Sequence, residues 1–212
     1  MSQNMKLVSI IGGARMLSSV RGGTFAGVIS LALAGCVNLG GKAPEQLISL
    51  SANTREQVGP VTTANMADAI VVLDPEADRS LDMLRVPVRI DPATIAYLKD
   101  IAWVERPARQ FRALLAETLR ARTDRIVVED GDYDVVGRTT VSGRLLSMGY
   151  DAPSQSVIVR VDMRREEQGG AITSRRFESI VPGVQPQAEP VAAALGRAAN
   201  DVADEVASWV VQ

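Results

Sequence analysis

The residue whose side-chain chemistry stands out in this chain is its single cysteine, Cys36. One cysteine cannot form a disulfide within the chain, and it cannot supply a cysteine-rich zinc site. The sequence contains no histidine, which excludes Ser-His-Asp and Cys-His catalysis and removes the commonest metal ligand. Cys36 is therefore either the acceptor of a covalent modification or a small buried apolar side chain.

The residues before Cys36 have the layout of a signal peptide. Positions 1–21 carry basic residues and no acidic one, and positions 22–34 form an uncharged apolar run. This run has the length of a signal-peptide h-region and is shorter than the roughly 20 residues that span a bilayer. It ends in a sequence that resembles the lipobox of bacterial lipoprotein precursors: Leu33, Ala34, Gly35 and Cys36.

We therefore expect residues 1–35 to be a lipoprotein signal peptide, Cys36 to carry the lipid, and residues 36–45 to be a short tether. Each buried CH₂ group contributes about 0.8 kcal/mol, so two or three acyl chains such as palmitate anchor a protein stably. Val37, rather than Asp, follows the cysteine, which favours the outer membrane, facing the periplasm, in enterobacterial-type sorting. The alternative is an uncleaved N-terminal anchor. Met16 is a second candidate start, and the lipobox is the same with either.

Clustered acidic residues are the other groups that could do chemistry. Residues 129–134 (EDGDYD) have the alternating aspartates of a calcium loop, but the glycine is misplaced and no bidentate Glu follows. The pairs Glu129/Asp130 and Glu166/Glu167 would be the acid/base candidates of an enzyme. Adjacent acids on turns are more often solvated, so we expect no enzyme, no metal and no cofactor beyond the lipid on Cys36.

Composition and periodicity predict one domain, over residues 46–212. Apolar residues make up 46% of the chain and the net charge is −2, which is ordinary for a globular domain and gives no basic stripe for nucleic acid. Apolar and alternating runs predict strands, over residues 48–50, 69–73, 82–90, 94–98, 102–104, 126–128, 139–148, 157–164 and 172–180. We expect hairpins around Lys99-Asp100 and at residues 168–170, and Pro87 predicts an edge strand or a bulge.

Two segments predict amphipathic helices. One opens at Arg106-Pro107 and carries an apolar stripe from Phe111 to Leu119. The other covers residues 191–210, with Asn200 among its polar residues. The expected fold class is α+β: a single domain with an antiparallel or mixed β-sheet and two amphipathic helices packed on one face.

The segment from Leu84 to Ala121 (LRVPVRIDPATIAYLKDIAWVERPARQFRALLAETLRA) resembles the ABC-type transport auxiliary lipoprotein family. The likeness lies in the Val86-Pro87 strand, in Tyr97 and Trp103, and in the Leu-rich helix that follows. With the lipobox and the Ala/Val-rich last helix, the resemblance extends over nearly all of residues 36–212. The tether here is shorter than in many relatives and lacks their proline run.

The resemblance implies a non-catalytic, membrane-anchored periplasmic lipoprotein of an Mce-type ABC transport system, moving phospholipid or other hydrophobic molecules between inner and outer membranes. It implies an Mce-family protein and ABC permease and ATPase subunits as partners, and it leaves a homo-oligomer open. No P-loop is present, so ATP hydrolysis would belong to a partner. Tyr97 and Trp103 could line a partner or lipid groove, or pack between sheet and helix. The alternative function is an envelope structural or assembly lipoprotein without a transporter.

Overall fold

The computed structural model describes residues 46–59, 63–129 and 138–212, which belong to one compact unit. Within them the elements in chain order are β1 (Gln46–Ile48), a 3₁₀ turn (Met66–Asp68), β2 (Ile70–Val72), β3 (Glu76–Ala77), β4 (Arg85–Arg89), β5 (Ile95–Trp103), α1 (Pro107–Arg120), β6 (Val127–Glu129), β7 (Thr139–Asp151), β8 (Ser156–Glu167), β9 (Ile172–Val181) and α2 (Ala188–Val210). The predicted signal peptide, the tether and most of the acidic turn lie outside the described residues.

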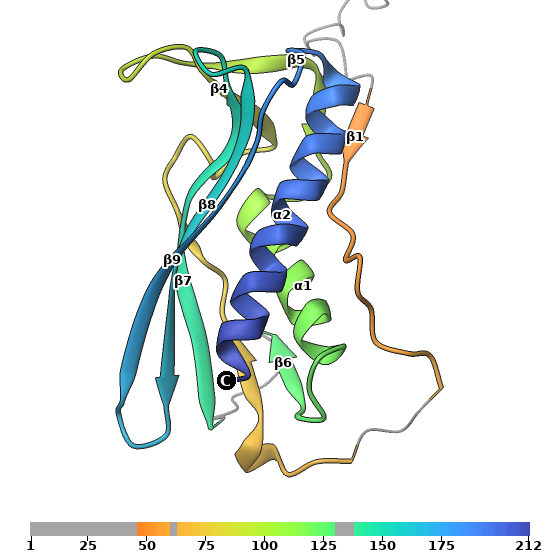
Figure 1. Cartoon of the computed structure of the whole chain (residues 1–212), viewed down its shortest axis with the longest axis vertical. Coiled ribbons are helices and arrows are strands. Elements are labelled where there is room, and N and C mark those ends of the chain that lie inside the picture. Colours follow the sequence, from red (N-terminus) through yellow and green to blue (C-terminus); the bar gives the residue numbers. More distant parts are fainter. Residues whose placement is uncertain (1–45, 60–62, 130–137) are drawn as a thin grey trace, which may run out of the picture. The chain divides into compact units, whose positions relative to one another are not determined.

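β7 is the central strand of a nine-stranded mixed sheet (Figure 1). β8 pairs antiparallel with β7 over nearly its whole length, and β9 pairs antiparallel with β8. The opposite side of β7 is shared in succession by β2, β3 and β4, each parallel to it. β5 and β1 follow beyond β4, and β6 lies beyond β2. The predicted α+β class is confirmed, with a sheet that is mixed rather than purely antiparallel.

Alternation along the strands separates the two faces of the sheet. The inward residues of β8 are fully buried: Val157, Val159, Val161 and Met163. The residues paired with Val161 on the neighbouring strands, Leu145 and Phe177, are buried as well. This side faces the helices. We call the opposite side of β7, β8 and β9 the outer face; Arg160 and Ile158 lie there and are only half-buried.

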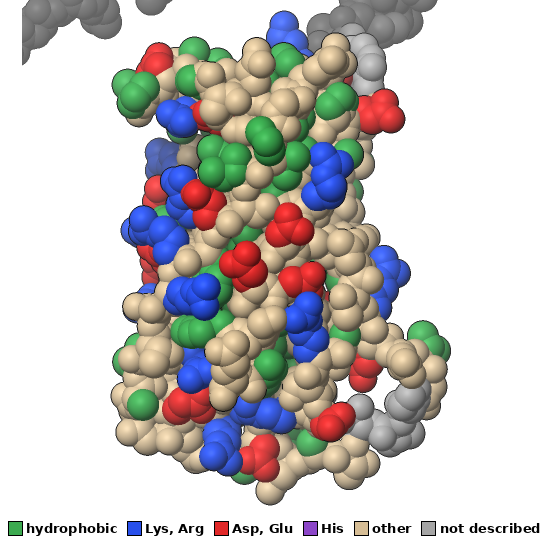
Figure 2. Space-filling view, in the orientation of Figure 1, with side chains coloured by type: hydrophobic (Ala, Val, Ile, Leu, Met, Phe, Trp, Pro, Cys, Tyr) green, Lys and Arg blue, Asp and Glu red, His purple; other side chains and the backbone are tan. Residues whose placement is uncertain are grey.

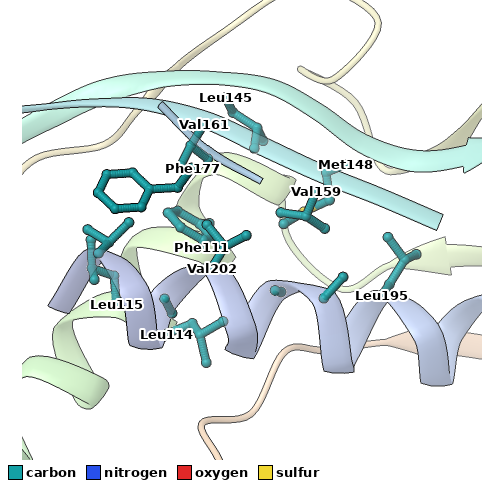
Figure 3. Close-up of a cluster of buried hydrophobic side chains, with 14 of the residues drawn as sticks. Phe111, Leu114, Leu115, Leu145, Met148, Val159, Val161, Phe177, Leu195 and Val202 are labelled. Carbon is teal, nitrogen blue, oxygen red and sulfur yellow. The ribbon is translucent and has the colours of Figure 1, made fainter. Parts of the chain in front are cut away.

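The core lies between the sheet and the two helices, as Figure 3 shows. α1 begins at Pro107, as predicted, because proline in the first helical turn needs no hydrogen-bond acceptor. Phe111 and Leu115 of α1 and Leu195 of α2 are completely buried against the sheet. Burying such side chains contributes about 1.5–3 kcal/mol each, so these contacts hold the helices on the inner face. No helix among the described residues has the length and apolarity to cross a membrane.

The hairpin predicted around Lys99-Asp100 is wrong. β5 runs without interruption from Ile95 to Trp103, and the chain reverses earlier, where Ile90 N–H donates to Thr94 C=O at 3.0 Å. The two polar residues lie in a large bulge, with Asp100 at a φ of 62°. Aspartate tolerates this left-handed conformation, which is why the pair resembles a turn in the sequence.

Pro87 causes a bulge, as predicted, but does not lie on an edge strand. The pairing of β4 with β5 shifts between Arg85 and Pro87, which face Ala102 and Tyr97. On its other side β4 lies against the end of β7. A Cβ atom at Gly149 would come within 2.4 Å of the Pro87 carbonyl oxygen, so glycine on β7 allows this close approach.

Candidate interaction surfaces

The lipidation residues predicted from the sequence lie outside the described residues. They are Leu33, Ala34, Gly35 and Cys36. The other two candidates, Tyr97 and Trp103, are both on β5. Trp103 is 1% exposed and belongs to the core beside the helices. Tyr97 is half-buried on the opposite side of the sheet, where the Arg85 guanidinium lies 4.6 Å from its ring centroid. The two rings therefore do not line a common groove.

An extended segment, residues 49–56, runs from β1 along the helices; we call it the anchor arm (Figure 1). Side chains of the helices bond its backbone. Leu50 N–H donates to Gln110 Oε1 at 2.8 Å, and Asn53 N–H donates to Asn200 Oδ1 at 2.7 Å. Asn200 Nδ2 donates in return to the Ser51 carbonyl at 3.0 Å. The backbone N–H and C=O groups of the arm therefore find hydrogen-bond partners in side chains of the helices rather than in a neighbouring strand.

Two buried amides make this attachment, and the sequence analysis missed both. Gln110 is 8% exposed and Asn200 is 5% exposed, so each needs partners to offset its desolvation. Gln110 Nε2 also donates to Glu105 C=O at 2.7 Å, and Asn200 Nδ2 to Gly196 C=O at 2.8 Å. Placing Asn200 on the polar face of its helix was wrong. Its neighbours Ala199 and Val202, both buried, were the available signal.

The outer face carries charged side chains in rows across the strands. Arg176 donates two hydrogen bonds to Asp162, of 2.6 and 2.8 Å, and Arg160 pairs with Glu178. Arg144 lies 3.7 Å from Glu76 of β3. On a different face, the one in view in Figure 2, to which α2 belongs, acidic and basic side chains are interspersed as well. A surface with both signs in a defined order is suited to recognising another protein by charge complementarity.

The Arg176–Asp162 pair changes the proton affinity of both groups. The hydrogen bonds from Arg176 lower the pKa of Asp162 below its usual value of 3.8. The same bonds raise the pKa of the Arg176 guanidinium. Both groups are therefore charged throughout the physiological range, so the outer face keeps these two opposite charges.

Hollows in the described surface are either small or open and charged. A pocket of about 130 Å³ lies where β4 meets β7; apolar residues such as Leu81, Ile95 and Ile158 line it together with Arg89 and Asp151. Sites for drug-sized ligands measure about 300–1,000 Å³, so this pocket fits a single side chain. Two wider hollows of about 640 and 730 Å³ are lined mainly by charged and polar residues. The described residues include no cluster of three metal-ligating side chains.

Solved structures that share this fold include the following two. A Xanthomonas campestris protein assigned to the family DUF330 is 15% identical, with 78% of this chain and 95% of that chain covered and a TM-score of 0.65. A crystal structure of an uncharacterized protein is 12% identical, with 77% and 97% covered and a TM-score of 0.61. No curated protein matches this sequence.

A family model matches residues 49–207, from the start of the anchor arm to the last turn of α2. The match therefore includes α1, most of α2, the whole of β2 to β9 and the two amides that bond the arm. Its description is an ABC-type transport auxiliary lipoprotein component, in agreement with the resemblance seen in the sequence. The chain belongs to the family of ABC-type transport auxiliary lipoprotein components.

Proposed function

We propose that this protein is the lipid-anchored accessory subunit of an Mce-type ABC transport system that moves phospholipid or other hydrophobic molecules between the inner and outer membranes. Its role is to dock other subunits and not to catalyse a reaction. Membership of the auxiliary lipoprotein family is the observation that carries the proposal. The lipobox ending at Cys36 supports the anchor, and Val37 supports the outer membrane as its location.

The anchor arm supports a platform held close to the membrane. Ten peptide units separate Cys36 from Gln46, and such a stretch spans at most about 35 Å. Beyond it, the arm is bonded to α1 through Gln110 and to α2 through Asn200. Tension on the lipid anchor would therefore reach β1, which pairs with β5, and then the helix layer through these two bonds.

The described hollows favour docking over carrying lipid. The small pocket beside Pro87, which Arg89 and Asp151 line as well as apolar residues, holds about 130 Å³; this suits one anchoring side chain of a protein partner and not an acyl chain. The wider hollows are lined by charges, such as Arg144 and Arg164 in one and Arg125 and Glu167 in the other. We infer that lipid passes through partner subunits while this chain supplies contacts for them.

Co-purification tests the proposed partners. The tagged full-length protein, solubilised in detergent from its own membranes, should retain an Mce-family protein together with permease and ATPase subunits. The same experiment with an unrelated tagged lipoprotein controls for envelope fragments. Recovery of the intact protein without any Mce-type or ABC subunit would overturn the proposal and favour an envelope structural role.

Metabolic labelling tests the anchor. Cys36→Ser should lose incorporated fatty acid and release the protein from the membrane fraction, because a hydroxyl is not the thiol that accepts diacylglycerol. Val37→Ala keeps the lipobox and should keep the label. Density-gradient fractionation should place the wild-type protein with the outer membrane. Undiminished labelling of Cys36→Ser would refute the lipidation site.

A further inference from the structure

β9 is a long border strand of the sheet (Figure 1). It contains ten residues, Ile172 to Val181, and its pairing with β8 shows no register shift. Among the described residues β9 pairs with β8 alone. A strand of this length without proline or a bulge is an open template for another strand, and proteins usually shorten, cover or pair such edges.

The pairing phase shows which backbone groups point to the open edge. Glu167 N–H donates to Ala171 C=O at 2.9 Å, so these two residues form a hydrogen-bonded pair of the antiparallel ladder. With no later register shift, the odd-numbered residues of β9 bond to β8. The N–H and C=O groups of the even-numbered residues point away from β8: Ile172, Ser174, Arg176, Glu178 and Ile180.

The charged rows of the outer face reach this edge with opposite signs. Cross-strand register gives one row across β3, β7, β8 and β9 that alternates in sign: Glu76, Arg144, Asp162 and Arg176. The next row ends the other way, with Arg160 on β8 opposite Glu178 on β9. The edge therefore presents a cation and an anion two residues apart, on the same face.

We propose that β9 pairs antiparallel with β9 of a second copy of this chain, with Phe177 of the two copies opposite each other. Arg176 then lies opposite Glu178 of the second copy, and Glu178 lies opposite Arg176 of the second copy. Both are even-numbered residues, so the outward backbone groups form the new ladder and the outer faces of the two copies lie on the same side. The two-fold axis makes the interface self-complementary.

In this register each charged row continues across the interface without a break in alternation. Arg160 and Glu178 are followed by Arg176 and then Asp162 of the second copy. A shift of two residues in one direction places Arg176 opposite Arg176 of the second copy, and a shift in the other direction places Glu178 opposite Glu178. Like charges directly opposite are destabilising, so charge selects the register centred on Phe177.

The inner side of the edge is compatible with the same register. Phe177 is 2% exposed and its ring lies 5.6 Å from that of Trp209, so it stays covered by its own chain. Arg175 would face Ser179 of the second copy. In each chain the Ser179 hydroxyl donates a hydrogen bond to Asp201 at 3.0 Å. Asp201 of the second copy would therefore lie near Arg175 and offset this inward-facing charge, which by itself would discourage strand pairing.

The protein mass in solution tests this interface, with the full-length lipoprotein in density-matched detergent and sedimentation equilibrium as the readout. Wild-type protein should form dimers or assemblies with an even number of chains. Arg176→Glu and Glu178→Arg should each weaken self-association by about tenfold or more, because two like-charge pairs replace two opposite-charge pairs. An equimolar mixture of the two variants restores both opposite-charge pairs, so association should return.

Arg144→Glu is the matched control, since it reverses a charge on the same face two strands from the edge and should leave association unchanged. Ser174→Pro is a second variant: it removes one N–H from the open edge but none that bonds β8, so it should also weaken association. Far-UV circular dichroism checks that each variant is folded. A monomeric wild type, or association that ignores both reversals, would overturn the proposal, as would a mixture that stays dissociated.

Discussion

The side-chain oxygen of Asn200 on α2 accepts a hydrogen bond of 2.7 Å from the backbone N–H of Asn53, 147 residues earlier in the chain. The nitrogen of the same amide donates to the Ser51 carbonyl at 3.0 Å. The amide thus bonds one donor and one acceptor of the anchor arm, much as a neighbouring strand would. Through these two bonds, Asn200 holds the start of the folded domain on its last helix.

Loss of this amide should loosen the anchor arm. Asn200→Ala leaves the Asn53 N–H and the Ser51 carbonyl without their partner, at a cost of about 1–3 kcal/mol in the free energy of unfolding. Hydrogen exchange at residues 50–53 should accelerate more than elsewhere. Denaturant unfolding and exchange mass spectrometry measure both effects. Arg197→Ala, at an exposed position of the same helix, should change neither; equal behaviour of the two variants would contradict the attachment.

Arg165 on β8 closes the C-terminal end of α2. Its Nη1 donates to the Trp209 carbonyl at 2.8 Å, and the guanidinium lies 5.4 Å from the Trp209 ring centroid. The last carbonyls of a helix lack partners within the helix and favour a nearby cation. Arg165→Met keeps the aliphatic stem and should lower the free energy of unfolding by about 1–2 kcal/mol. The neighbouring Arg164→Met, on the exposed outer face, should be close to neutral in the same denaturation experiment.

Two glycines should respond to alanine in opposite directions. A Cβ atom at Gly149 would lie 2.4 Å from the Pro87 carbonyl oxygen and 2.8 Å from its Cγ, so Gly149→Ala should destabilise the protein by about 1–3 kcal/mol. A Cβ at Gly196 in α2 meets nothing within 4 Å, and Gly196→Ala should stabilise by about 0.5–1 kcal/mol. Thermal unfolding compares them. A neutral Gly149→Ala would show that β4 and β7 can separate without cost.

The Asp162–Arg176 pair should make a small contribution to stability that depends on pH. A carboxyl whose pKa is lowered in the folded state stabilises the fold above its unfolded pKa, and this is lost as pH falls through the folded value. The Tm difference between the wild type and Asp162→Asn should therefore be constant above about pH 5, begin to shrink near the usual pKa of 3.8, and vanish only below the lowered pKa of the folded state. The side chains are 43% and 62% exposed, so the difference will be small.

Differential scanning fluorimetry from neutral to acidic pH, at one protein concentration, measures this difference. Asp124→Asn, at an exposed position, is the control for the removal of one carboxyl group. Asp91, whose pKa is also lowered, is present in both proteins and cancels from the comparison. If the Tm difference between the wild type and Asp162→Asn persisted at acidic pH, packing or hydrogen bonding of the side chain, and not its charge, would account for the difference.

The local sequence pattern predicted the structure correctly where buried residues recur with the period of a strand or a helix. The alternation on β8 places Val157, Val159, Val161 and Met163 inward, and Pro107 begins α1, both as predicted. It failed at Asp100, because a polar residue suited to positive φ occurs in bulges as well as in turns. It failed also at Asn200, since an amide within a helix is polar by type and the partner that buries it lies far away in the sequence.

By itself the sequence determined the family, the α+β class and the residue predicted to carry lipid. The lone cysteine and the absence of histidine are facts of composition, and the periodicity of strands and helices involves only residues close together in the chain. Only the tertiary structure decided that β7 is shared by three parallel strands, that Trp103 and Tyr97 lie on opposite sides of the sheet, and that β9 is an edge strand among the described residues. These depend on pairings between distant segments, where many arrangements satisfy the same local pattern and packing selects one.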